Sequence, residues 1–138
     1  MFKVNKMDIK VMKLNFERQE TQGKKFNLKP VVSGGLGKVG TRYFTEVSVK
    51  IQDNKSSENG RFPFNLEATL RAVFDISDVD DEKKVHAFLM KQGVHVLYPY
   101  VRAAVSSLTS SAMVSPVTLP IIDAARFASE AMKPEKRE

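Results

Sequence analysis

The chain has 138 residues and a mass of 15.5 kDa, which is enough for one domain with a substantial core and too short for two. It has no cysteine, which excludes disulfides, thiol catalysis and thiolate metal sites. The formal net charge is +6. The first 50 residues hold 11 Lys and Arg against 4 Asp and Glu, and the rest hold 11 against 12, so the first half favours anionic partners.

The first part of the chain has the alternating pattern of β-strands. Residues 7–16 alternate with one change of phase between Val11 and Met12. Such a slip indicates a β-bulge or a strand that serves two surfaces. Residues 26–32 alternate around Pro30, and a proline at that place favours an edge strand or a crossover loop.

Three glycines in the next segment have the spacing G-x-G-x-x-G, at Gly35, Gly37 and Gly40. In a dinucleotide-binding unit this motif follows a strand and opens a helix, whose N-terminus holds the pyrophosphate. Here a strand pattern follows from Thr41 onward. The segment is therefore predicted to be a flexible hairpin connection and not a nucleotide site.

Two long alternating segments complete the strands. Residues 41–52 alternate cleanly, and residues 62–76 form the longest alternating run in the chain. A polar, turn-forming stretch at 53–60 separates them. Residues 1–76 are therefore predicted to be mainly strands, arranged as an antiparallel meander.

Residues 78–112 have helical patterns. The segment 78–92 begins with acidic residues, as helix N-termini prefer, and Gly93 is expected to end this first helix. A long helix follows, and its apolar residues recur at helical spacing. These residues are Leu97, Val101, Ala104, Val105, Leu108 and Ala112.

The opposite face of the long helix carries little charge. Arg102 is its only charged residue, and serine and threonine supply the rest. A surface helix usually presents more charge to water. One interpretation is a serine-rich surface helix. The other is a helix covered on both sides, by its own sheet and by another subunit.

The predicted fold class is α+β: a four-stranded antiparallel sheet, a long helix and a short C-terminal helix, in a single domain of residues 1–138. The tail helix is predicted at 123–132, with Asp123 as its N-cap. His86 and His95 do not have the spacing of metal ligands on one helix face, and we find no catalytic motif. Neither an enzyme, nor a cofactor, nor a metal site is expected. No apolar signal core or membrane-spanning run is present, so we expect a cytoplasmic protein without membrane insertion.

The long helix and the link after it carry a family resemblance. The stretch contains Leu97-Tyr98-Pro99-Tyr100-Val101-Arg102, then Ser106-Ser107-Leu108-Thr109-Ser110, then Leu119-Pro120. This resembles the SecB export chaperone family, whose helix carries Leu/Ile-Phe-Pro-Tyr-x-Arg, then Ser/Thr-Ser-x-x-Ser and a proline-rich link. The order of elements agrees over most of the chain, whereas only residues 94–120 match closely.

The resemblance implies an ATP-independent chaperone that holds unfolded or nascent polypeptides, including preproteins for export, in apolar surface grooves. Family members are homotetramers, arranged as dimers of dimers. The positions that match the grooves lie in the crossover loop, the second strand and the tail helix: Phe26, Leu28, Val32, Leu36, Phe127 and Met132. The positions that match subunit interfaces are Leu66, Ala68, Ser106, Ser107 and Ser110.

The chain departs from the family in its charge. The export chaperone docks on the SecA motor through an acidic sheet face. Glu17 and Glu67 keep acids at matching positions, but Lys13 replaces one, and a net charge of +6 argues against motor docking. SecB-like relatives that hold an aggregation-prone antitoxin offer an alternative role. A basic nucleic-acid-binding module is a further alternative, although an aromatic platform interleaved with Lys and Arg is missing.

Overall fold

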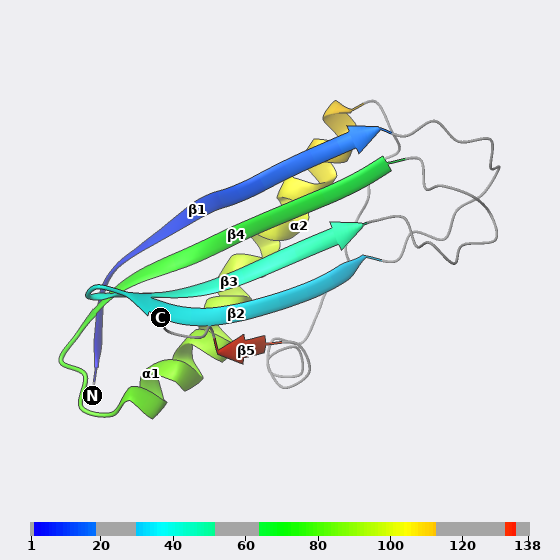
Figure 1. Cartoon of the computed structure of the whole chain (residues 1–138). Coiled ribbons are helices and arrows are strands. Elements are labelled where there is room, and N and C mark those ends of the chain that lie inside the picture. Colours follow the sequence, from blue (N-terminus) through cyan, green and yellow to red (C-terminus); the bar gives the residue numbers. More distant parts are fainter. Residues whose placement is uncertain (1, 19–29, 52–63, 113–131, 135–138) are drawn as a thin grey trace.

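The computed structural model describes residues 2–18, 30–51, 64–112 and 132–134, which form one sheet and one helical layer (Figure 1). The strand order is β1-β4-β3-β2-β5. The pairs β1–β4, β4–β3 and β3–β2 are antiparallel, whereas β2–β5 is parallel. The elements are β1 (Lys3–Arg18), β2 (Val31–Val39), β3 (Arg42–Ile51), β4 (Phe64–Ser77), α1 (Glu82–Phe88), the π-helical turn η1 (Leu89–Gly93), α2 (Val94–Ser111) and β5 (Met132–Pro134).

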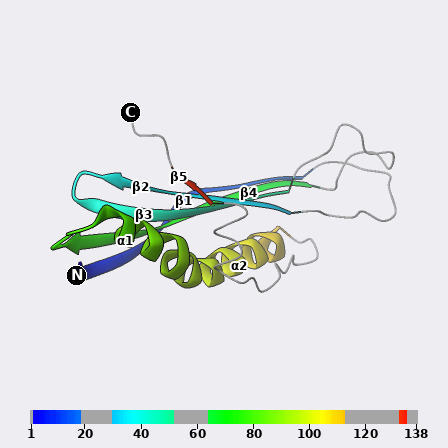
Figure 2. The same cartoon turned by 90° about the horizontal axis from the view of Figure 1, so that it is seen from below.

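This arrangement confirms the predicted α+β fold with a four-stranded antiparallel sheet followed by a long helix. The predicted meander is correct for β2, β3 and β4 and wrong for β1, which crosses over to pair with β4 and not with β2. Within the described residues, the helices lie on one face of the sheet and the other face, which we call the open face, is uncovered (Figure 2). On the helix side, every second residue of β3 and β4 is buried, as their alternation predicted. The helical layer covers this row with Val85, Leu89, Val94, Leu97, Tyr98, Val101 and Val105.

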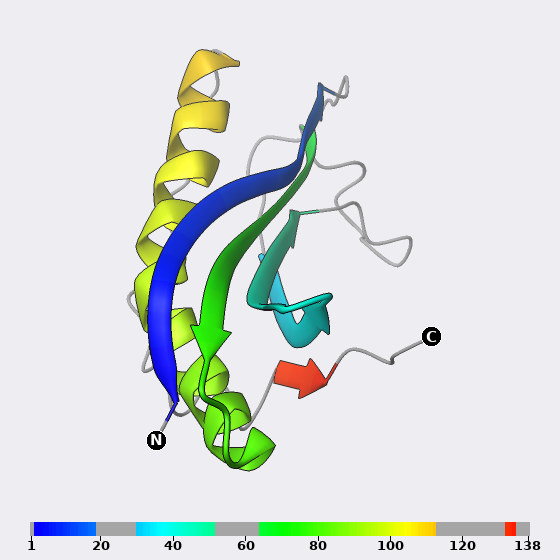
Figure 3. The same cartoon turned by 90° about the vertical axis from the view of Figure 1, so that its left-hand side faces the viewer.

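The predicted phase change in β1 is a β-bulge. The register with β4 shifts between Val11 and Lys13, and a second shift lies between Val4 and Lys6. Because one extra residue is inserted, the strand before and after it presents apolar residues to the same side of the sheet. Bulges also bend a strand, and β1 curves visibly along its length (Figure 3).

The glycine-rich segment is a strand, so the expectation of a flexible hairpin connection was wrong for Gly35 and Gly37. Both lie inside β2, which pairs with β3 from Val31 to Val39. That ladder satisfies the backbone groups whatever the side chains are, so the strand continues through its glycines. Only Gly40 lies in the hairpin turn, with φ of 61°, a conformation that glycine adopts without steric cost.

The first helix begins as its sequence predicts. The Asp81 carboxylate accepts a hydrogen bond from the Lys83 backbone N–H at 3.0 Å and so caps α1. The Tyr43 hydroxyl donates to Glu82 at 2.8 Å and ties this first turn to β3. Burial, followed by that hydrogen bond, raises the pKa of Tyr43. Among the described helices, none combines the length and the apolar character needed to cross a membrane.

Gly93 does not end the first helix, and that prediction is corrected. α1, η1 and α2 follow one another without a break, and Gly93 has a helical φ of −60°. A Cβ at this position would collide with the Thr45 hydroxyl and lie 2.8 Å from the Thr45 Cβ. The Thr45 hydroxyl donates to the Leu89 carbonyl at 2.8 Å. Glycine is therefore used here for close approach of the helix to β3 and not as a stop signal.

The fifth strand was not predicted. Met132, the expected last residue of the tail helix, lies in β5 and pairs with Gly34. The edge of β2 would otherwise present unpaired backbone groups on that side, and β5 pairs with three of its residues. The rest of the predicted tail helix, residues 123–131, lies outside the described residues.

Candidate functional site

The described part of the predicted client-binding site gathers at the β2–β5 edge. Val32 lies on β2 and is half-buried, and Met132 lies on the neighbouring β5. Leu36, also on β2, has only 3% of its surface exposed and belongs to the core, so its expected contact with clients is corrected. The other three predicted positions, Phe26, Leu28 and Phe127, lie outside the described residues.

The family motif divides between the two sides of α2. Leu97 and Tyr98 are buried against the sheet, and burial raises the pKa of Tyr98. Pro99 and Tyr100 point the other way, with Tyr100 51% exposed, and Arg102 is half-buried. Leu97 and Tyr98 therefore stabilise the fold, whereas Pro99 and Tyr100 are exposed within the part of the chain that the structure describes.

The predicted subunit-interface residues also separate into two groups. Ser107 and Ser110 are exposed on the outer face of α2, and Ser106 is half-buried there. Leu66 and Ala68 are instead buried under the helical layer, with 2% and 0% of their surfaces exposed. Because β4 residues with even numbers face the helices, these two side chains have no surface to offer another subunit. Their assignment to an interface is therefore corrected.

An exposed apolar row on β1 was missed by the sequence analysis. β1 forms one edge of the sheet, so its outer backbone groups have no strand partner among the described residues. Its exposed apolar side chains are Val4 at 39%, Met7 at 42%, Val11 at 57%, Met12 at 48% and Leu14 at 45%. The signal was present in the sequence, because one long helix cannot cover the apolar face of four long strands.

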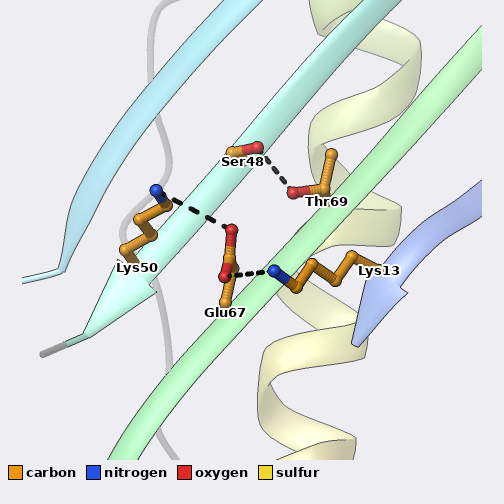
Figure 4. A network of polar contacts seen from close by, with 5 residues as sticks. All are labelled: Lys13, Ser48, Lys50, Glu67 and Thr69. Carbon is orange, nitrogen blue, oxygen red and sulfur yellow. Dashed lines mark hydrogen bonds and ion pairs between the residues drawn. The ribbon is translucent and has the colours of Figure 1, made fainter. Parts of the chain in front are cut away.

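One of the two acids at positions that match the family's motor-docking face is neutralised on the open face of the sheet. Glu67 on β4 lies between two lysines from the neighbouring strands (Figure 4). Its Oε2 is 3.0 Å from the Lys13 Nζ, and its Oε1 is 3.7 Å from the Lys50 Nζ. The hydrogen bond from Lys13 is the main reason why the pKa of Glu67 is lowered. Two lysines around one glutamate leave this part of the face positive, whereas motor docking in the family uses an acidic one.

The Glu67 pKa predicts a change in acid stability. Because its folded pKa lies below the usual 4.5, the carboxylate stabilises the fold above that value and loses this contribution as the pH falls through the folded pKa. Glu67→Gln is therefore expected to make stability depend less on pH in this acid range. Urea unfolding at a series of pH values would measure it. Glu17→Gln is the matched control, and an equal change of slope in both variants would contradict the prediction.

The fold and these surfaces define a class of protein: an α+β module with one sheet face under a helical layer and one face and edge left open. A solved structure of this class is the SecB-like chaperone of Mycobacterium tuberculosis, in complex with a ChAD peptide from the HigA1 antitoxin. The TM-score is 0.67 at 19% sequence identity, over 88% of this chain and 90% of that one. The family of preprotein translocase subunit SecB matches residues 3–133. The chain belongs to the SecB family.

Curated relatives match over part of the sequence. The protein-export protein SecB of Dinoroseobacter shibae is 35% identical over 79 residues, which is 56% of this chain and 45% of that protein. An uncharacterized protein of Methanocaldococcus jannaschii is 30% identical over 92 residues, which is 65% of this chain and 59% of that protein. The chain thus spans about half the length of the curated relatives it matches.

Proposed function

We propose that this chain is an ATP-independent chaperone that binds unfolded polypeptides, including preproteins for export, and keeps them from folding or aggregating. The observation that carries the proposal is the match of the SecB family to residues 3–133. The fold of a SecB-like chaperone at a TM-score of 0.67 agrees with it. The named curated relative is a protein-export protein.

The energetics of holding an unfolded chain favour many weak contacts. Burying one large apolar side chain yields roughly 1.5–3 kcal/mol. Micromolar affinity needs about 8 kcal/mol, in addition to the cost of ordering the client. Several shallow subsites along one edge reach this total through multivalency. The half-buried Val32 at the β2–β5 edge is one such subsite in the described residues.

The proposal includes assembly of four copies as a dimer of dimers. A long edge strand with exposed apolar residues tends to pair with another strand unless something covers it. β1 has 16 residues and carries such a row, so a second copy of β1 is its natural partner. The second contact would use the outer face of α2, where Tyr100, Ser107 and Ser110 are exposed. These surfaces support assembly on both sides of each subunit.

An aggregation assay tests the proposed function. An unfolded client would be diluted from denaturant with and without the protein, in the absence of ATP, and its aggregation followed by light scattering. We expect suppression by a particle of about 62 kDa, four times 15.5 kDa. Unhindered aggregation of a folded sample would contradict the chaperone role, and a monomer that suppresses aggregation would contradict only the assembly.

Client contact at Phe127, a position implied by the family resemblance, gives a second test. Phe127→Asp is expected to weaken client holding by roughly tenfold or more, because one apolar contact of about 1.5–3 kcal/mol is lost. The mass of the assembly should not change. Phe127→Leu, which keeps an apolar side chain, is the control. If the aspartate variant holds clients as well as the parent, Phe127 does not contact them.

An antitoxin is a second candidate for the client. The net charge of +6 and the fold shared with a chaperone solved with an antitoxin peptide support it. A chaperone dedicated to one antitoxin would protect the product of a neighbouring gene much better than a generic unfolded protein. Equal protection of both in the same aggregation assay would remove this candidate.

A further inference from the structure

The side of the sheet that faces away from the helices can be seen in Figure 2. A shallow hollow lies on this face. Strands β1, β3 and β4 contribute to it. We call it the open-face hollow. Its lining consists of three cations, two carboxylates and one valine: Lys6, Lys10, Arg42, Asp8, Asp75 and Val73.

Part of the charge in the open-face hollow is balanced within the sheet. Asp75 on β4 lies opposite Lys6 on β1 and opposite Arg42 on β3. Opposite charges in cross-strand positions stabilise a sheet. Asp75 can compensate only one of its two neighbours in full, so this row keeps one positive charge in excess.

The next charged row contains a repulsive pair. Lys10 on β1 lies directly opposite Arg71 on β4, and like charges in such positions destabilise a sheet. Arg71 already has its partners, because its Nε is 3.0 Å from the Glu46 carboxylate and its guanidinium lies 3.9 Å from the centre of the Phe44 ring. Asp8 lies between Lys6 and Lys10 on the same face of β1, so the lining holds three positive charges against two negative ones. An anionic ligand would compensate this excess of one positive charge.

We propose that the open-face hollow docks an acidic segment of a polypeptide partner, with Lys6 and Lys10 receiving its carboxylates. Val73 supplies an apolar contact between them. Separate carboxylates of a peptide fit a site where cations alternate with Asp8 and Asp75. This docking surface goes beyond the chaperone function and does not depend on it.

A nucleic acid fits the same surface less well. Its phosphates form a continuous row of negative charge, which Asp8 and Asp75 would repel. Proteins that bind single strands also stack bases on exposed aromatic rings. Phe44, the aromatic residue on this face among the described residues, is only 3% exposed and lies under Arg71. The charge pattern and the missing stacking surface both favour the acidic peptide.

Binding of a labelled peptide that alternates glutamate with glycine to the full chain tests the proposal. Fluorescence anisotropy would compare the parent with the double variant Lys6→Glu and Lys10→Glu. Lys84→Glu with Lys91→Glu is the control, since it makes the same change of net charge at exposed positions in the helical layer. We expect the Lys6/Lys10 double variant to bind the peptide roughly tenfold more weakly than the parent, and the control to bind it roughly twofold more weakly. Binding should also weaken as salt is added, because these charges are exposed.

Three results would overturn the proposal. The first is absence of peptide binding by the folded parent. The second is equal weakening in both double variants, which would indicate attraction by net charge alone. The third is tighter binding of an oligonucleotide of equal charge that also depends on Lys6 and Lys10, which would assign the hollow to nucleic acid.

Two further measurements keep the test independent of folding and of the proposed function. Lys6 and Lys10 lie on the edge strand, so the mass of each variant is measured. If the mass of the double variant changes, Arg42→Glu on the interior strand β3 takes its place. This variant should weaken peptide binding as well. The aggregation assay with a weakly charged client should be unaffected by all these variants. If the chain binds the peptide but does not prevent client aggregation, the proposed chaperone function is wrong and the proposed docking surface is supported.

Discussion

Replacing Val11 by aspartate is expected to dissociate the assembly and to leave the chain folded. Val11 lies in the middle of edge strand β1 with 57% of its surface exposed, so its substitution removes little of the core. In an apolar contact between two β1 strands, the new carboxylate would lose its water without gaining a partner. An uncompensated buried charge costs about 3–5 kcal/mol, which raises the dissociation constant by roughly two to three and a half orders of magnitude.

Mass measurement in solution would check this prediction across a range of concentrations. Val39→Asp is the matched control, because Val39 is 64% exposed on β2 and lies away from β1. The control should keep the mass of the parent. An unchanged mass for the Val11 variant would exclude β1 as the interface. Leu66→Asp makes an instructive contrast: its side chain is buried in the chain itself, so that variant is expected to unfold and not merely to dissociate.

Gly93→Ala is expected to destabilise the chain, although alanine is the better helix former. By helix propensity alone, the change would stabilise by about 1 kcal/mol, since Gly93 has helical backbone angles. The added Cβ, however, collides with Thr45. It displaces the Thr45 hydroxyl, which donates a hydrogen bond to the Leu89 carbonyl. Overpacking costs about 1–3 kcal/mol, and the loss of one hydrogen bond costs about 1 kcal/mol. We expect a net loss of roughly 1–3 kcal/mol.

Urea unfolding would measure the sign as well as the size of this effect. Ala103→Gly is a suitable reference, because Ala103 is exposed on α2 and only helix propensity acts there. That reference should lose about 1 kcal/mol. A Gly93→Ala variant that is more stable than the parent would mean that the helix and β3 are not in close contact.

The strands show how far periodicity alone carries a prediction. The alternation of residues 41–52 and 62–76 placed the buried rows of β3 and β4 correctly, since each side chain must face either the helices or water. The change of phase after Val11 correctly predicted a β-bulge. In both cases the determining interaction lies within a few residues, and a local pattern records it.

Other features depend on partners that a local pattern does not contain. Gly93 reads as a helix terminator, but its role depends on Thr45, 48 residues earlier in the chain. The glycines of β2 suggested a loop, because the hydrogen bonds to β3 that hold them in a strand cannot be inferred from their local sequence. Leu66 and Ala68 were assigned by resemblance, and only the position of α2 shows which face of β4 they occupy. Met132 similarly follows the open edge of β2 and not its own helical periodicity.

The π-helical turn η1 also predicts that insertions and deletions within it are poorly tolerated. Inward-facing residues are four apart from Val85 to Leu89, five apart from Leu89 to Val94, and three apart from Val94 to Leu97. One residue turns an α-helix by about 100°, so removing a residue from η1 would rotate α2 against α1 by that angle. Either the apolar stripe of α2 or that of α1 would then face water. We therefore expect natural members of this fold to keep the length of η1, even where its exposed residues, here Lys91 and Gln92, differ.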